Sequence, residues 1–230
     1  MLTITRKLFS FSRGTKILFP ERILCENCVT THKKRFSTST IMNSAQKIKS
    51  EENLVWIDME MTGLDPVNDQ ILEVACLITD SNLKVIAEHP SLVIHQPDEV
   101  LKSMNDWCIE NHTKTGLVAA SERSNISLED AERQILEFIK KYTPAGKCPL
   151  AGNSVYMDRL FLRQHMPLVE NHLHYRIVDV STIKELCRRW HADSYAKAPR
   201  KKFNHRALMD IKESIQELRY YRSAIFKDNN

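Results

Sequence analysis

Residues 56–65 of the chain read WIDMEMTGLD, a stretch in which an apolar run meets two acidic residues and then a turn. The short apolar run over residues 53–58 is typical of a buried strand, and the residues from Thr62 to Pro66 are typical of a turn. Side chains two positions apart along a strand lie on one face, with their Cα atoms about 6.5 Å apart. We therefore expect the carboxylates of Asp58 and Glu60 to converge at the end of this strand.

The paired carboxylates have two interpretations, a solvated strand end or a site for divalent cations. Two further acids favour the cation site. Asp158 begins a predicted helix after the segment 152–154, and Asp210 lies in the first turns of the last predicted helix. Carboxylate oxygens suit Mg²⁺ or Mn²⁺, and two such ions about 3.5–4 Å apart stabilise both the attacking and the leaving oxygen of a phosphoryl displacement. The four acids therefore predict a two-cation site that acts on a phosphodiester.

His205 lies five residues before Asp210. Five steps along an α-helix turn about 500°, which leaves the two side chains about 140° apart and on different faces. If both residues serve one site, His205 must lie on the loop before the helix, where a group with an ordinary pKa of about 6.5 would act on an attacking water as general base. The alternative is a surface histidine without a chemical role, and the four acids favour the catalytic interpretation.

The remaining pattern predicts an α/β fold with a mixed sheet flanked by helices. Apolar runs predict a meander of strands at 53–58, 70–80 and 84–95, followed by strands near 149–153 and 177–180. Strands that come first and then alternate with helices indicate a single α/β domain. We expect this domain to occupy residues 51–230.

The predicted helices follow the third strand. Ser127, with Asp130 at the capping-box position, opens an amphipathic helix that continues to Tyr142. Further helices are predicted at 157–165, where Pro167 ends the helix, at 182–190, and from Leu208 to Ile225. Residues 191–204 are predicted to be a basic, mobile loop.

Charge is divided unevenly between the first fifty residues and the rest of the chain. Residues 1–50 carry ten Lys or Arg and two acids, whereas residues 51–230 carry 23 basic and 27 acidic residues. Affinity for long nucleic acids depends on a basic surface, so this acidic body argues against binding of long nucleic acid by charge alone. No stretch approaches the roughly 20 uninterrupted apolar residues that cross a bilayer, so we expect no membrane partner.

Residues 1–50 are rich in Arg, Lys, Ser and Thr and poor in acids, with apolar residues interspersed. A secretory signal would need a continuous apolar region of about 7–15 residues and a small-residue cleavage site, and neither is present. The composition is typical of a mitochondrial transit peptide, which predicts location in the matrix. The alternative is a disordered basic tail that binds nucleic acid. Initiation at Met42 would yield an untargeted cytoplasmic form.

These motifs make the chain similar to the DEDDh family of 3′-to-5′ exonucleases. Asp58-x-Glu60, Asp158 and His205-x-x-x-x-Asp210 match the family motifs in order and approximate spacing. Residues 56–65, 151–159 and 179–186 resemble the oligoribonuclease branch of that family, and the resemblance covers about residues 53–226. The basic N-terminal segment resembles that of the mitochondrial members.

This resemblance implies a ribonuclease-H-like fold, a homodimer, and hydrolysis of very short oligoribonucleotides, dinucleotides included, to 5′-mononucleotides. Asp58, Glu60, Asp158 and Asp210 would hold two divalent cations, Mg²⁺ or Mn²⁺. His205 would activate water. One departure from the family pattern is Met209, where relatives usually carry an additional Asp, and residues 200–203 also alter the loop before His205.

The resemblance also implies residues that bind the substrate. Leu64 and Trp107 would wedge against the bases, Ser154 and Arg176 would cap the 5′ phosphate, and Tyr175 would reach the active site of the partner subunit. A cap at one end and a wedge at the other would leave no exit for a longer chain. The alternatives are that Trp107 and Tyr175 are core or interface aromatics and that Arg176 is a solvated surface residue.

Two other functions stay open at the level of sequence. A DEDDh exonuclease with an open groove, including a DNA proofreader, would use the same chemistry on longer substrates. A catalytically silent RNA-binding scaffold would keep the fold without turnover, and the intact acids argue against it. Substrate length separates the first of these functions from hydrolysis of very short RNA.

Overall fold

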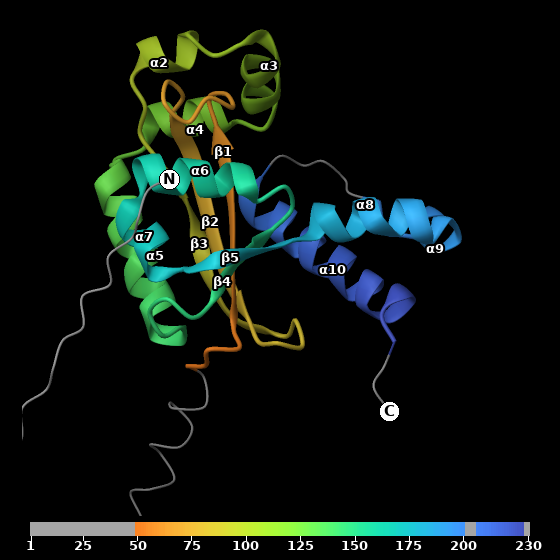
Figure 1. The fold of residues 1–230 in the computed structure, drawn as a ribbon. Helices are drawn as coiled ribbons and strands as arrows, with labels where there is room; N and C mark the ends of the chain where they lie inside the picture. Colours follow the sequence, from red (N-terminus) through yellow and green to blue (C-terminus); the bar gives the residue numbers. More distant parts are fainter. Residues whose placement is uncertain (1–48, 201–205, 228–230) are drawn as a thin grey trace, which may run out of the picture. The chain divides into compact units, whose positions relative to one another are not determined.

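A five-stranded mixed sheet lies at the centre of the described structure (Figure 1). The computed structural model describes residues 49–200 and 206–227, all within one compact unit, Thr38–Asn230. The strands are β1 (Leu54–Met61), β2 (Ile71–Thr79), β3 (Val85–Val93), β4 (Pro149–Gly152) and β5 (His174–Asp179), in the spatial order β3-β2-β1-β4-β5. The first three strands form an antiparallel meander, and β4 and β5 run parallel to β1. The predicted mixed sheet is confirmed.

Helices pack on both faces of this sheet. They lie in three stretches of the chain: between β3 and β4, between β4 and β5, and after β5. The described helices are α2 (Asp98–Lys102), α3 (Asp106–Lys114), α4 (Leu117–Arg123), α5 (Leu128–Tyr142), α6 (Tyr156–His165), α7 (Pro167–His172), α8 (Val180–Trp190), α9 (Ala192–Ala196) and α10 (Ala207–Ile225). None of the helices within the described residues is long and apolar enough to cross a lipid bilayer.

The alternation of side chains along β1 assigns each group of helices to one face. Val55, Ile57 and Met59 pack in a cluster with buried residues of α5, α6 and α7. Trp56 packs instead with buried residues of α8 and α10. Asp58 and Glu60 follow Trp56 at steps of two, so they lie on the face that α10 covers. The apolar core thus fixes which face of the sheet carries the acids.

The amphipathic helix predicted from Ser127 is present as α5. The Ser127 side chain accepts a hydrogen bond from the Asp130 backbone N–H at 3.1 Å, which satisfies one of the free donors at the helix start. Ala131, Ile135 and Ile139 are fully buried against the sheet. The Ser127 cap fixes where α5 begins, and the apolar spacing fixes which side of it packs on the sheet. Both features can be recognised in the sequence.

Several short helices were not predicted. The helices α2, α3 and α4 follow β3 and form a small cluster with Leu72 of β2. Pro167, which was predicted only to end a helix, occupies the start of α7, where the N–H that proline lacks is not needed. The predicted loop over 191–204 contains α9, which corrects that prediction, and its residues 201–204 lie outside the described residues. Helices of one or two turns show too little periodicity to be recognised from sequence.

Candidate active site

Three carboxylates meet on the α10 face of the sheet. Asp58 and Glu60 come from the end of β1, and Asp210 comes from the first turn of α10. One carboxylate oxygen from each residue lies within 4.8 Å of those of the other two. The convergence of Asp58 and Glu60 follows from strand geometry, whereas Asp210 arrives because α10 packs across β1. These residues form the acidic cluster.

Asp158 reaches the same end of β1 from the first turn of α6. Its side chain is buried, and its Oδ1 accepts a hydrogen bond from the Met59 backbone N–H at 3.0 Å. Met59 lies between Asp58 and Glu60 in the chain, so the fourth predicted acid is joined to the strand that carries the first two. Burial and the charge of Asp58 raise the pKa of Asp158 well above its usual range.

The electrostatics of the acidic cluster favour a bound cation. Burial first, and then the charges of Asp58 and Asp210, raise the pKa of Glu60 from the usual 4.5 to about 8. Carboxylates held this close repel one another unless a proton or a cation neutralises them. Their all-oxygen composition suits a hard divalent ion. Asp58, Glu60 and Asp210, with Asp158 beside them, therefore fit a divalent metal site.

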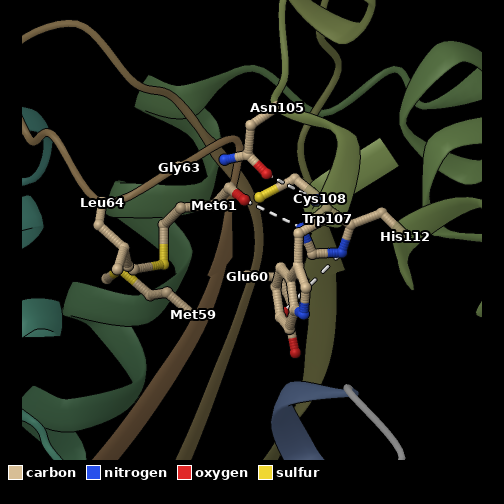
Figure 2. Close-up of a pocket in the computed structure, with 9 residues that line it drawn as sticks. All are labelled: Met59, Glu60, Met61, Gly63, Leu64, Asn105, Trp107, Cys108 and His112. Carbon is tan, nitrogen blue, oxygen red and sulfur yellow. Dashed lines mark hydrogen bonds and ion pairs between the residues drawn. The ribbon is translucent and has the colours of Figure 1, made fainter. Parts of the chain in front are cut away.

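A cavity of about 400 Å³ opens beside Glu60 (Figure 2). We call it the Leu64–Trp107 cavity, and its lining residues are Met59, Glu60, Met61, Gly63, Leu64, Asn105, Trp107, Cys108 and His112. Figure 2 shows Leu64 on one side of the view and Trp107 with His112 on the other. Leu64 is 69% exposed and Trp107 is 59% exposed, so neither is a core residue. The acidic cluster and an apolar cavity therefore share one wall.

The turn after β1 holds Leu64 at the edge of this cavity. The Thr62 hydroxyl donates to Asp69 Oδ1 and the Asp65 backbone N–H donates to Asp69 Oδ2, both at 2.9 Å. A Cβ atom at Gly63 would lie 2.3 Å from Asp69 Oδ2, so a side chain at that position would disrupt the turn. The Thr-Gly-Leu-Asp sequence thus presents an apolar side chain on a rigid turn.

Trp107 is presented by the first turn of α3. The Asn105 side chain caps this helix by accepting a hydrogen bond from the Cys108 backbone N–H at 2.9 Å. His112, one turn further along α3, is buried, and its Nε2 donates to the Met61 carbonyl at 3.0 Å. The other ring nitrogen, Nδ1, lies 3.9 Å from Glu60 Oε2. Sequence reasoning missed His112, because nothing local links α3 to the end of β1.

The other predicted substrate residues lie at β4 and β5. The Ser154 backbone N–H donates to Asp179 Oδ1 at 3.0 Å, and the Ser154 and Ser181 hydroxyls are hydrogen-bonded at 2.9 Å. Ser154 has a φ of 56°, in the left-handed region that non-glycine residues rarely adopt. Tyr175 is 70% exposed, and the Arg176 guanidinium lies 5.2 Å from the centre of its ring. His205, the predicted base, lies outside the described residues.

An ion pair beside the acidic cluster was also missed. Glu73 on β2 lies directly across from Glu60 in the sheet register and is fully buried. The Arg206 guanidinium donates to its two carboxylate oxygens at 3.0 and 3.1 Å. A sequence signal for this site exists, because Glu73 is the one charged residue in an otherwise apolar strand. An isolated acid in a buried strand requires a partner, but the sequence does not identify it.

Comparisons with known proteins agree with this geometry. The family model described as Exonuclease, RNase_T, matches residues 55–218. The chain is 58% identical over 176 residues to the mitochondrial oligoribonucleases of Mus musculus and Homo sapiens, which covers 76% of this chain and 74% of each relative. Among solved structures, an exonuclease I from Methylocaldum szegediense superposes with a TM-score of 0.58 at 20% identity, over 75% of this chain and 41% of that chain. That likeness supports the ribonuclease-H-like fold.

The family match and the identity to the two mammalian relatives each extend over most of the described sheet and helices. The family match, over residues 55–218, includes the positions of all four acids that meet at the end of β1. The chain therefore belongs to the DEDDh exonuclease family, in its oligoribonuclease branch.

Proposed function

We propose that the chain is a 3′-to-5′ exoribonuclease that hydrolyses very short oligoribonucleotides, dinucleotides included, to 5′-mononucleotides. The observation that carries this proposal is the shared wall between the acidic cluster and the Leu64–Trp107 cavity. The cavity volume of about 400 Å³ lies in the range of small-molecule sites, about 300–1,000 Å³. Family membership and the names of the mammalian relatives support the same activity.

The four acids would hold two divalent cations, Mg²⁺ or Mn²⁺. Asp58, Glu60 and Asp210 offer converging oxygens, and Asp158 adds a buried carboxylate beside them. When bound, such ions polarise the phosphodiester and lower the pKa of an attacking water. The raised pKa of Glu60 means that loading the site releases a proton near neutral pH.

His205 would act as the general base of this reaction. It directly precedes Arg206 in the sequence, and the Arg206 carbonyl accepts the first hydrogen bonds of α10, the helix that carries Asp210. In the proposed step His205 takes a proton from the attacking water and the water oxygen bonds to phosphorus. The bond from phosphorus to the 3′ oxygen of the preceding nucleotide breaks, and that oxygen keeps the electron pair and takes up a proton from water to become the 3′ hydroxyl of the shortened chain. The released product carries the 5′ phosphate.

The substrate would be held at its two ends. Leu64 and Trp107, both exposed and both lining the cavity, would contact the bases, and stacking on an aromatic ring contributes about 1–3 kcal/mol per base. Ser154 and Arg176 would bind the 5′ phosphate. Tyr175 projects from the edge strand β5 and would reach the partner's site in a homodimer. Binding both ends favours a chain of defined, short length.

Substrate length tests the proposed function. We expect single-turnover cleavage, with Mg²⁺ or Mn²⁺ present, to be faster on an RNA dinucleotide than on an RNA twenty-mer. Faster cleavage of the twenty-mer would instead support an exonuclease with an open groove, and a DNA twenty-mer distinguishes a proofreader. Asp210→Asn is the matched control, because it should lower the rate by more than about 10²-fold while the fold is retained. Binding of RNA without any turnover would support the silent scaffold.

We also propose that residues 1–50 direct the chain to the mitochondrial matrix, and that residues 51–230 form the exonuclease domain. The basic, acid-poor composition of that segment and the mitochondrial relatives support this location. A C-terminal tag tests it, because the tagged protein should appear in the matrix and, after initiation at Met42, in the cytoplasm. Tag confined to the cytoplasm would overturn the import proposal.

A further inference from the structure

The ion pair between Glu73 and Arg206 lies where α10 meets the sheet, next to the acidic cluster. We propose that Arg206 is a positioning residue: its pairing with Glu73 fixes the first turn of α10 and thereby holds Asp210 against Asp58 and Glu60. This inference rests on the proposed role of Asp210 as a metal ligand. It assigns a function to a side chain that does not itself belong to the cluster.

The first step of the argument is the geometry of the pair. The Arg206 guanidinium donates from Nε to one Glu73 oxygen at 3.1 Å and from a terminal nitrogen to the other at 3.0 Å. Two parallel hydrogen bonds of this kind fix orientation as well as distance. Glu73 is fully buried in β2, so the acceptor is part of the rigid sheet. Arg206 is therefore anchored to the sheet itself.

The second step is the connection from Arg206 to Asp210. The Arg206 carbonyl accepts hydrogen bonds from the backbone N–H of Met209 at 2.9 Å and of Asp210 at 3.1 Å. Arg206 occupies the N-cap position of α10, and its side chain makes no capping bond to the helix. The Arg206 side chain thus binds the sheet, and its carbonyl binds the first turn of α10. The orientation of Asp210 therefore depends on a residue that is hydrogen-bonded to both elements.

The third step is charge. Glu73 lies across from Glu60, so without Arg206 a further buried carboxylate would lie beside a cluster that is already acidic. A buried charge without its partner is strongly unfavourable, so Glu73 would either take up a proton or reach water through a shift of the sheet or the helix. Such a shift would separate Asp210 from Asp58 and Glu60. Arg206 consequently keeps the cluster together in a way that a neutral residue would not.

The chain offers a matched control on the same helix. Lys212 of α10 pairs with Glu88 of β3 at 2.9 Å, and both side chains are 39% exposed. This pair also joins α10 to the sheet, but it lies on the surface, where ion pairs contribute little. Lys212→Gln therefore removes a contact between helix and sheet without affecting the anchor of Asp210.

The test compares Arg206→Gln, Arg206→Lys and Lys212→Gln with the wild type by Mn²⁺ calorimetry and by kcat and KM on an RNA dinucleotide. Arg206→Gln should weaken Mn²⁺ binding and lower kcat by roughly 10- to 100-fold each, with KM little changed. Arg206→Lys, which keeps the charge and loses the paired geometry, should lie between Arg206→Gln and the wild type. Lys212→Gln should stay within about twofold of the wild type.

Circular dichroism and thermal melting identify any variant that fails to fold. If Arg206→Gln does not fold, Arg206→Lys carries the test, and wild-type Mn²⁺ affinity and kcat in that variant would overturn the proposal. Wild-type values in a folded Arg206→Gln would overturn it as well. Failure of the proposed function is distinguishable from failure of this inference. If the wild type does not cleave RNA dinucleotides, the proposed substrate is rejected. If Arg206→Gln still binds Mn²⁺ more weakly than that wild type, the positioning role of Arg206 is retained.

Discussion

Glu60 belongs both to the acidic cluster and to the wall of the Leu64–Trp107 cavity. Burial and the charges of Asp58 and Asp210 raise its pKa to about 8, so the metal-free group is largely protonated at neutral pH. A cation that binds there must displace the proton. Cation affinity should therefore rise as the pH rises toward 8.

The raised pKa of Glu60 also makes the free energy of unfolding depend on pH. In the unfolded chain Glu60 loses its proton near pH 4.5, whereas in the metal-free fold it keeps the proton up to about pH 8. Its contribution to the free energy of unfolding is fully present below pH 4.5 and is lost as the pH rises through 8. Urea denaturation in EDTA should show the wild type losing stability relative to Glu60→Gln as the pH is raised across this window. A stability difference between the two proteins that does not change with pH, or a wild type that gains stability relative to Glu60→Gln as the pH rises, would contradict the raised pKa.

Trp107 is 59% exposed, so its loss should affect the substrate more than the fold. Trp107→Ala should raise KM for an RNA dinucleotide by roughly 5- to 150-fold, the equivalent of about 1–3 kcal/mol of base stacking. The free energy of unfolding should change by less than about 0.5 kcal/mol. Trp190→Ala is the matched control, because Trp190 is 69% exposed at the end of α8 and does not line the cavity. Equal effects of the two changes on KM would argue against a base-binding role.

At the scale of elements, Arg159 joins α6 to both α7 and β5. It is buried, donates to Glu170 Oε1 at 2.9 and 3.1 Å, and donates to the carbonyls of His174 and Arg176 at 3.0 and 3.3 Å. Those two carbonyls flank Tyr175. The residue after Asp158 therefore positions the strand that carries Arg176, one of the two proposed 5′-phosphate residues.

Removing Arg159 should destabilise the whole layer formed by α6, α7 and β5. Arg159→Met leaves two strand carbonyls without this donor and the Glu170 carboxylate with only the exposed Arg163, and should lower the free energy of unfolding by about 3–5 kcal/mol. Arg163 donates to the same Glu170 oxygen at 3.1 Å but is 59% exposed, so Arg163→Met should cost less than about 1 kcal/mol. Urea denaturation measures both. Similar losses for the two variants would mean that burial does not decide the strength of this network.

At the scale of the whole molecule, the proposed homodimer places Tyr175 in the partner's active site. β5 is the edge strand of the sheet, where a second copy can approach, and Tyr175 is 70% exposed on it. Asp210→Asn and Tyr175→Ala should each be weak enzymes alone. When the two variants are mixed and exchange subunits, activity should be regained. The heterodimer then contains one site with intact acids and an intact tyrosine from the partner subunit.

The controls for this experiment use the separate proteins. Asp210→Asn mixed with wild type should give activity in proportion to the wild-type subunits. No recovery in the mixture of the two variants, with subunit exchange verified by mass, would reject the contribution of Tyr175 across the interface. Ultracentrifugation of the wild type at several concentrations measures whether a dimer forms at all.

Sequence by itself determined the strand that carries Asp58 and Glu60, the meander that follows it, and the capped helix α5. These features are local, because the period of two along a strand, the cap at Ser127 and the turn from Thr62 depend on neighbouring residues only. The positions of Asp158 and Asp210 at the starts of two predicted helices then indicated that they join the first two acids, and the family motifs agreed with this prediction. The short helices α2, α3, α4, α7 and α9 escaped prediction because one or two turns carry too little periodicity.

Only the tertiary structure decided what surrounds the acids. Glu73 meets Arg206 across 133 positions of sequence, and His112 reaches the end of β1 across 51. Such pairs depend on the register of β1 against β2 and on where α3 and α10 pack, and no local pattern encodes either. The pKa of Glu60 has the same origin, since burial and neighbouring charges exist only once these elements are assembled.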